Sequence, residues 1–537
     1  MNKWTIILLV SAENNLINES VKAIEEIYQV QQCDEVTFLI IFDGLEFGKF
    51  SSAFAKPSLY KVNCENGFFI DKPEFVHRSE NLASKATLED FLRYIKDNFK
   101  AENYGFVYKG HGGSGETDIS SGVFIEKPFS IPASIVDDDE KIKEYIKRQI
   151  SKKVEFESSY LYRGFAKSKS SKQVVMVIFR RKTESTAWLT YKGIASCIKT
   201  VFKEKIGFVC LDCCWGQQIE NAFAFADVAE NFIASVDESP ALGIGYTEIC
   251  KKIVQRPDII PEEIANMIVA VYYYRNYNDY DSTDPEFRKM GVSMTNISTR
   301  LLAKNESNAG NSFQEKMREF CDYVIPRMST LYSIITQARK KCKDYTYANT
   351  EALKADQIIY PIFNIDLPWF LTNLKFYNKE KDMALDKLIS ELLMKIEYDL
   401  ITGYLGSNYK KPVLGGSTAF TGGNGLSIVF PISKKHADDC ESLFSQTKLE
   451  FYVATNWRAL LNAYYDALED SLKSVDMKLW TSFNTESFSF PLFKVQESYE
   501  KSGHDQTDFT FNKFKTEISK DINTDESEED ANWGRII

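Results

Sequence analysis

Apolar and polar positions follow two alternating patterns in the first 250 residues. Continuous apolar runs, typical of strands covered on both faces, occur at Thr5–Val10, Val36–Phe42, Tyr104–Tyr108, Ile206–Leu211 and Phe232–Val236. Apolar residues at helical spacing lie between them, at Leu16–Tyr28, from Thr87 to Phe99, and at Trp188–Phe202. Strands that alternate with helices predict an α/β fold with a mostly parallel sheet and helices on both faces.

An unusually long connection, roughly 116–186, separates the third predicted strand from the fourth. It contains the acidic run Asp137–Glu140, and Lys- and Arg-rich stretches follow between 141 and 182. Because Ser, Lys and Gly are frequent there, we expect an exposed, mobile segment. The apolar run Val174–Phe179 inside it predicts one additional strand.

Beyond Tyr246 the pattern becomes mainly helical. The predicted helices are Pro261–Tyr274, Phe313–Lys341 with a break at Pro326, Lys381–Leu400 and Trp457–Leu472. A Gly-rich loop at 415–425 precedes a predicted strand, Leu426–Phe430. This loop lacks the Gly-Lys-Ser/Thr ending of a phosphate-binding loop, so we interpret it as a turn.

Composition narrows the functional classes. The 537 residues are 44% hydrophobic, enough for two or three folded domains, and the net charge of −11 argues against nucleic acid as the main partner. No apolar run is long enough to span a bilayer, so no membrane partner is expected, and a monomer is favoured.

Two features bear on location. The apolar run Thr5–Ala12 is followed by Glu13, Asn14 and Asn15 instead of a small-residue cleavage pattern, so it is interpreted as a strand and not as a signal peptide. Ten cysteines without framework spacing fit free thiols in a reducing compartment. We therefore predict a cytoplasmic protein, with secretion by another route left open as the alternative.

Chemically active residues gather where predicted strands end. His111 and Gly112 follow the third strand, Asp212-Cys213-Cys214 ends the fourth, and Asp237 and Glu238 follow the fifth. The carboxyl ends of parallel strands meet at one edge of a sheet, where ligands bind. A thiol and a histidine there make a nucleophile with a proton-transfer partner, and the Gly112 N–H is available to an oxyanion. A helix predicted at 215–230 would favour a thiolate at Cys214 through its N-terminal dipole.

Other interpretations of these residues stay open. Cys210, Cys213 and Cys214 could all be small buried hydrophobic residues. Cys210 and Cys213 could form a C-x-x-C redox motif, although such motifs open a helix and Cys210 lies within a predicted strand. Zinc is disfavoured, because no second C-x-x-C or His pair is present. Asp212 could bind a cationic substrate side chain or only cap the following helix.

These residues resemble the clostripain-like cysteine peptidases, a family with the caspase-type α/β fold. The family's His-Gly-x-Gly is similar to His111-Gly112-Gly113-Ser114, with the second Gly displaced by one position. Its Asp-x-Cys, followed by Gly and Glu, is similar to Asp212-Cys213-Cys214 with Gly216 and Glu220, and this selects Cys214 over Cys213. The resemblance implies a thiol protease that cuts after Arg or Lys and matures by autoprocessing in the 141–182 loop.

With the resemblance added, Cys214 is expected to attack the scissile carbonyl and His111 to protonate the leaving amine. The backbone N–H groups of Gly112 and Cys214 would hold the oxyanion. The predicted P1 pocket consists of Asp212, Ser235, Asp237 and Glu238. The expected partner is a protein or peptide substrate. No metal or other cofactor is required for this chemistry, and calcium dependence is left open.

The predicted domains are a caspase-like peptidase core at 1–250 with the 116–186 insertion, a helical region at 251–410 that packs on the core, an α+β region at 411–515, and an acidic, disordered tail at 516–537. The alternative function is a catalytically inactive caspase-like module that acts as a partner-binding or regulatory protein.

Overall fold

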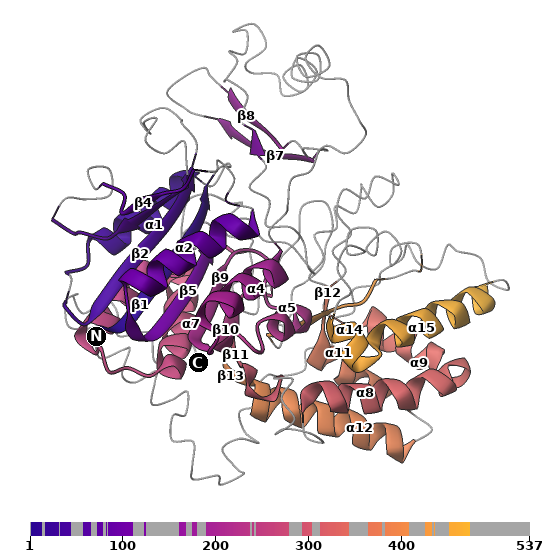
Figure 1. The fold of residues 1–537 in the computed structure, drawn as a ribbon. Coiled ribbons are helices and arrows are strands. Elements are labelled where there is room, and N and C mark those ends of the chain that lie inside the picture. Colours follow the sequence, from indigo (N-terminus) through magenta and orange to yellow (C-terminus); the bar gives the residue numbers. More distant parts are fainter. Residues whose placement is uncertain are drawn as a thin grey trace, which may run out of the picture.

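The fold is given by a computed structural model (Figure 1). It describes residues 2–12, 17–31, 33–44, 57–65, 72–78, 82, 84–110, 123–124, 161–167, 174–179, 190–236, 239–240, 243–278, 293–302, 312–342, 364–378, 382–406, 425–431, 434 and 450–472. His111, Gly112, Asp237 and Glu238 lie outside the described residues, as do the loop at 415–424 and the tail from 516. Predictions about these residues therefore rest on the sequence.

A nine-stranded sheet forms the centre of the described structure, in the order β13-β11-β10-β9-β5-β1-β2-β3-β4. Its parallel strands are β1 (Asn2–Ala12), β2 (Val36–Gly44), β5 (Ala101–Lys109), β9 (Ile206–Asp212) and β10 (Ala229–Ala234). Antiparallel strands extend both edges: β3 (Ser58–Lys61) and β4 (Phe75–Val76) on one side, β11 (Ser293–Ser298) and β13 (Ile401–Gly406) on the other. The predicted α/β class with a mostly parallel sheet is confirmed.

Helices cover both faces of this sheet (Figure 1). One layer contains α1 (Ile17–Tyr28), α6 (Tyr246–Gln255) and α7 (Pro261–Asn278), and the other contains α2 (Lys85–Asn98), α4 (Tyr191–Phe202) and α5 (Ile219–Ala224). Successive side chains of a strand point to opposite faces. In β1, Ile6 and Leu8 enter one core while Ile7 and Leu9 enter the other, which explains why its apolar run is continuous.

The C-terminal half is rich in helices, as predicted. It contains α8 (Phe313–Val324), α9 (Met328–Lys340), α11 (Leu367–Tyr377), α12 (Met383–Met394), α14 (Glu450–Thr455) and α15 (Trp457–Leu472). The break predicted at Pro326 is confirmed, since a 3-10 turn at Ile325–Arg327 separates α8 from α9. A π-helical turn at Lys395–Leu400 ends the α12 segment, and a 3-10 turn at Thr299–Leu301 follows β11.

Strands from outside the first 250 residues also take part. β11 and β13 come from the predicted helical region, yet they extend the central sheet, and α7 packs on that sheet. A separate pair joins β12 (Asn364–Asp366) to β14 (Ser427–Val429). The strand predicted in the long connection is confirmed as β8 (Val174–Phe179), which pairs with β6 (Val123–Phe124) and β7 (Leu161–Lys167).

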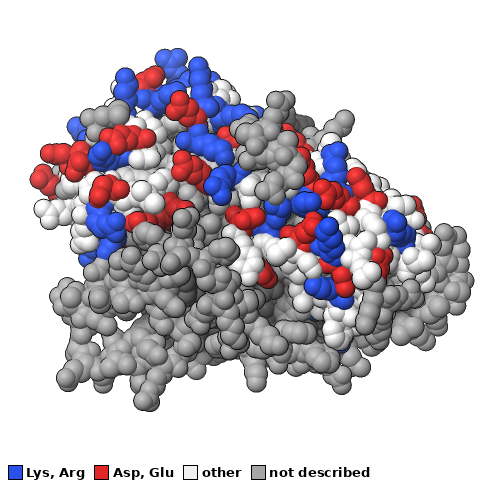
Figure 2. All heavy atoms as spheres, turned by 90° about the horizontal axis from the view of Figure 1, so that it is seen from below, with Lys and Arg blue, Asp and Glu red and all other residues white. Residues whose placement is uncertain are grey.

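Two further observations concern the surface charge of the described elements and the length of their helices. Acidic and basic side chains are interspersed over the described part of the face in Figure 2, so that part shows no extended field of one sign. Among the described helices, none has the length and apolar character needed to cross a membrane.

Candidate active site

Two neighbouring parallel strands, β5 and β9, end at the same edge of the sheet. Their register places Lys109 opposite Asp212, the last residue of each strand. His111 and Cys214 each follow two positions later in the sequence. The described residues therefore include Cys214 and its surroundings, and the end of the strand that leads to His111.

The three cysteines near the end of β9 have different surroundings. Cys210 is fully buried, and Cys213 is 2% exposed with its Sγ 3.3 Å from the Tyr191 hydroxyl oxygen. Burial raises the pKa of both thiols well above the ordinary range. Cys214 lies in the turn beyond the strand and is partly exposed. Since a nucleophilic thiol must ionise and meet its substrate, Cys214 is the fitting candidate of the three.

The redox interpretation of Cys210 and Cys213 does not fit the packing. Cys210 belongs to the core that α1, α6 and α7 cover, whereas Cys213 belongs to the core on the opposite face. Two thiols on opposite faces of a sheet cannot form a disulfide without backbone movement. These two cysteines are small buried residues.

The helix predicted at 215–230 is wrong at both ends. The helix α5 begins at Ile219 with Gln218 as its N-cap, so Cys214 lies five residues before it, and β10 begins at Ala229. The backbone just before α5 is bonded to two other segments instead of forming a helical turn. Gln217 N donates to Ser235 O at 2.8 Å, and Gln217 O accepts from Ser427 N at 3.2 Å. The dipole of α5 therefore does not act directly on the thiol.

Trp215 shapes the turn that carries Cys214. Its φ of 52° lies in the left-handed region, which costs a non-glycine residue of order 1 kcal/mol or more. Its side chain is 2% exposed and packs with Val236, against which Cys214 also packs. Burial of this indole holds the backbone in a conformation that leaves the neighbouring thiol partly accessible.

Ser239 contacts the nucleophile candidate, which sequence reasoning did not anticipate. Ser239 N lies 3.3 Å from Cys214 Sγ and is placed to donate to it, and Ser239 Oγ donates to Cys213 O at 2.9 Å. This N–H can stabilise a thiolate, whereas Ser239 O, 4.0 Å from the same sulfur, can accept a hydrogen bond from the neutral thiol. The position of Ser239 just after Asp237 and Glu238 was the one available signal.

Asp212 is buried and already paired. Its side chain is 1% exposed, and its Oδ2 accepts from Lys109 Nζ at 3.0 Å and from the Tyr246 hydroxyl at 2.7 Å. This geometry favours the interpretation in which Asp212 holds the strand end over one in which it contacts a substrate. Ser235, another predicted pocket residue, is fully buried, and its Oγ lies 3.2 Å from Ser293 Oγ.

The sequence model of the clostripain family matches residues 163–362. The matched segment includes Asp212, Cys213 and Cys214, and it begins after His111. Over these residues the chain is similar to the clostripain family. In the sheet order β5 lies beside β9, so the strand that leads to His111 and the strand that leads to Cys214 are neighbours.

Three solved structures are similar to this clostripain-like chain. A secreted C11 cysteine protease from Bacteroides thetaiotaomicron, in complex with an irreversible peptide inhibitor, is 13% identical, with 85% of this chain and 100% of that chain covered and a TM-score of 0.49. An inactive zymogen C11 protease from Parabacteroides distasonis is 15% identical, with 85% and 99% covered and a TM-score of 0.48. The secreted C11 protease "iotapain" from B. thetaiotaomicron is also 15% identical, with 84% and 99% covered and a TM-score of 0.46. No curated protein matches the sequence.

The predicted cytoplasmic location is contradicted by these comparisons, because two of the similar structures are of secreted proteases. The prediction rested on cysteine spacing and on the character of the first apolar run. Unpaired cysteines describe side-chain chemistry and do not by themselves define a compartment.

No group of His, Cys, Asp or Glu side chains in the described ranges could hold a metal ion.

Proposed function

We propose that this clostripain-like chain is a cysteine endopeptidase with Cys214 as nucleophile and His111 as its proton-transfer partner. The observation that carries the proposal is the contrast among the three thiols: Cys214 alone of Cys210, Cys213 and Cys214 lies partly exposed beyond the strand end. The adjacent strand β5 ends at the same level, two residues before His111.

In the proposed reaction, the Cys214 thiolate attacks the scissile carbonyl carbon, and a carbon–sulfur bond forms as electrons move to the carbonyl oxygen. The backbone N–H groups of Gly112 and Cys214 stabilise this oxyanion. The carbon–nitrogen bond then breaks while His111 gives a proton to the leaving amine. Water attacks the thioester, loses a proton to His111, and releases the carboxylic acid and the Cys214 thiolate.

Cleavage after Arg or Lys is the proposed specificity. Asp237 and Glu238, which follow β10 and the buried Ser235, would supply the negative charge of the P1 pocket. Asp212 contributes less in this proposal, since Lys109 already pairs with its carboxylate. Self-cleavage within 141–182 is proposed as the route to activation, because that connection is rich in Lys and Arg.

Peptide amides with Arg, Lys, Asp or a neutral residue at P1 test these statements. We expect Cys214→Ala and His111→Ala to lower kcat/KM by at least about 10³-fold, as for other nucleophile and base replacements. Cys213→Ala is the matched control and should keep most of the activity, because that thiol is buried and bonded to Tyr191.

The outcomes separate the parts of the proposal. Wild-type cleavage by Cys214→Ala contradicts cysteine catalysis by this residue. Preference for neutral or acidic P1 residues, with Cys214→Ala inactive, removes only the basic pocket. A Cys214 that does not react with iodoacetamide near neutral pH, in a chain that cleaves no peptide, favours the inactive partner-binding module.

A further inference from the structure

Lys109 and Asp212 form an ion pair that is buried where β5 and β9 end. The side chains are 6% and 1% exposed, and Nζ lies 3.0 Å from Oδ2. Removing two charges from water costs several kcal/mol for each ion, so such a pair persists only with good geometry and further partners. The pair joins the strand that leads to His111 with the strand that leads to Cys214.

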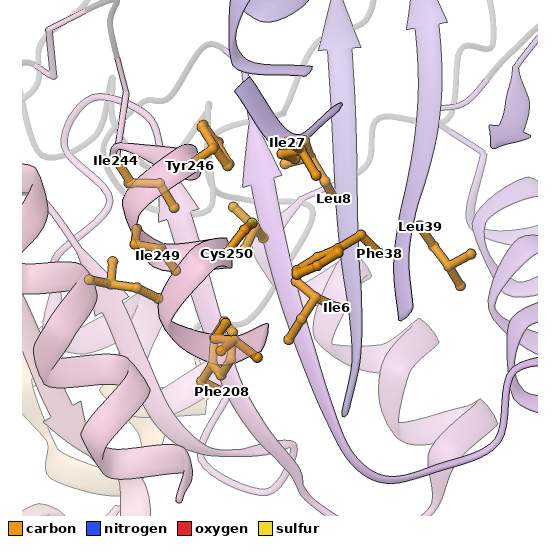
Figure 3. Close-up of a pocket in the computed structure, with 13 residues that line it drawn as sticks. Ile6, Leu8, Ile27, Phe38, Leu39, Phe208, Ile244, Tyr246, Ile249 and Cys250 are labelled. Carbon is orange, nitrogen blue, oxygen red and sulfur yellow. The ribbon is translucent and has the colours of Figure 1, made fainter. Parts of the chain in front are cut away.

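Tyr246 supplies a further partner from the first turn of α6. Figure 3 shows its ring among apolar side chains between α6 and the sheet, where they line a cavity of about 20 Å³. Its hydroxyl donates to Asp212 Oδ2 at 2.7 Å, and burial raises the pKa of Tyr246 well above its ordinary value. Tyr246 is therefore a neutral donor to the carboxylate.

The backbone of Gly243 covers the Lys109–Asp212 pair, and no other residue type fits at position 243. Its φ is +76°, and a Cβ at this position would lie 2.5 Å from Asp212 Oδ2 and 2.8 Å from Lys109 Nζ. Asn276 Nδ2 donates to Gly243 O at 3.0 Å and holds this backbone in place. The close approach of the Gly243 backbone limits the access of solvent and substrate to Asp212.

The chain segment that covers the pair also reaches the nucleophile. Ser239 N lies 3.3 Å from Cys214 Sγ, four residues before Gly243 and seven before Tyr246. Asp212 itself is two residues before Cys214. Cys214 is therefore linked to the ion pair in two ways: through Asp212, which precedes it by two residues, and through Ser239, which contacts its sulfur.

We propose that Lys109 and Asp212 are a positioning pair for Cys214, in which Lys109 is the internal counter-ion that withdraws Asp212 from substrate recognition. The proposal rests on Cys214 being the nucleophile of the proposed function. Because the two charges balance, neither acts alone on the thiol. Loss of Lys109 leaves an uncompensated carboxylate at Asp212, two residues before Cys214 in the sequence. Loss of Asp212 leaves an uncompensated ammonium group at Lys109, on the strand that pairs with the one leading to Cys214.

The charged and titratable groups around Cys214 come from several elements. In the described part of the chain they include Cys210 of β9, Cys213 just after that strand, Tyr191 of α4, Tyr246 of α6 and Tyr272 of α7. Burial raises the pKa of both thiols and of Tyr246 and Tyr272, so these groups are uncharged near neutral pH.

The charged side chains near these groups form two ion pairs, Lys109–Asp212 and Glu26–Arg275. Glu26 also accepts a hydrogen bond from Tyr246 N at 3.1 Å. His111, Asp237 and Glu238 lie outside the described residues.

Alkylation of the full chain by iodoacetamide between pH 6 and 10 tests the pair, with the Cys214 peptide quantified by mass spectrometry. Lys109→Met leaves an unbalanced carboxylate, so the pH of half-maximal alkylation rate should rise. Asp212→Asn leaves an unbalanced ammonium group, so that pH should fall. Each shift should be about one pH unit, a usual effect of one uncompensated charge near a titratable group.

The double variant Lys109→Met/Asp212→Asn removes both charges and should return the midpoint to within about 0.3 units of wild type. Lys199→Met and Asp227→Asn are matched controls, because they break a more exposed pair with Nζ and Oδ2 3.1 Å apart. These control variants should leave the alkylation midpoint unchanged. If Lys109→Met does not fold, Lys109→Gln keeps a donor toward Asp212 without the charge and carries the same expectation.

A merely structural pair would change stability without moving the two midpoints in opposite directions. Shifts of the same sign, unchanged midpoints, or no recovery in the double variant overturn the proposal. Peptide cleavage does not enter this measurement. A chain that alkylates as expected but cleaves no peptide would therefore contradict the proposed function and leave the positioning pair intact.

Discussion

Two buried acids, Glu220 and Asp43, illustrate how a single residue responds to its surroundings. Glu220 of α5 is 3% exposed, and its Oε1 accepts from Val429 N at 3.1 Å, which links α5 to β14. Burial raises its pKa to about 7. Asp43, at the end of β2, is 3% exposed, and burial raises its pKa to about 7 as well. Both carboxyl groups therefore keep their protons to a higher pH in the folded protein than exposed carboxyl groups do.

Glu220→Gln should change the pH dependence of stability. A raised pKa in the folded state gives a contribution that is complete below the unfolded pKa near 4.5 and is lost as pH rises through about 7. Gln keeps an amide oxygen for Val429 N and does not ionise, so the variant should gain about 2–3 kcal/mol relative to wild type between pH 5 and pH 8. Urea unfolding midpoints at the two pH values measure this.

Asp97→Asn, on the exposed side of α2, serves as the control for that measurement and should show no comparable pH-dependent gain. A Glu220→Gln difference from wild type that stays constant from pH 5 to pH 8 would contradict the expected ionisation of this carboxyl group.

At the scale of the element, β5 and β9 must lie close together to bring their ends into register. Gly105 of β5 is opposite Phe208 of β9, and the Phe208 ring lies across the position where a Cβ at 105 would be. Glycine in a strand interior often marks such a close approach. The sheet beneath the site therefore depends on the absence of a side chain at one position.

Gly105→Ala should destabilise the protein by about 1–3 kcal/mol, because the added methyl group forces the Phe208 ring or the β5 backbone to move. Thermal unfolding of the variant measures the effect. Combining it with Phe208→Leu, which removes the contacting ring atoms, should cost less than the sum of the single changes. Additive losses would show that the two positions do not compete for the same space.

At the scale of the whole molecule, the long connection between β5 and α4 links the two halves of the proposed dyad in sequence. Residues from 110 to 190 run between the strand that precedes His111 and the helix that precedes β9. Since β5 and β9 pair directly in the sheet, a cut in the connection leaves that pairing in place. Self-cleavage is therefore compatible with retention of the core.

Purified wild-type protein should contain two fragments whose new termini follow a Lys or Arg between 141 and 182, whereas Cys214→Ala should remain one chain. Intact-mass spectrometry after denaturation measures both. An uncut wild-type chain with full activity, or the same cut in Cys214→Ala, would rule out activation by self-cleavage.

The sequence alone determined the central strands and the position of Cys214, the proposed nucleophile, at a strand end. Runs such as Ile206–Leu211 are apolar at every position because both faces are buried, and this signal is local. Pro326 ended a helix for an equally local reason, since it cannot continue the helical hydrogen bonding. The family resemblance then selected Cys214 over Cys213.

Tertiary structure decided the remaining features, because their causes lie far away in the chain. β11 and β13 have no long apolar run and become strands by pairing at the edge of the sheet. The helix α5 begins late because Gln217 pairs with Ser427, 210 residues further on. The local sequence shows only that residue 212 is an aspartate. Its pairing with Lys109 follows from the register of β5 with β9. Local periodicity reports that a residue is buried, whereas the fold determines its partners.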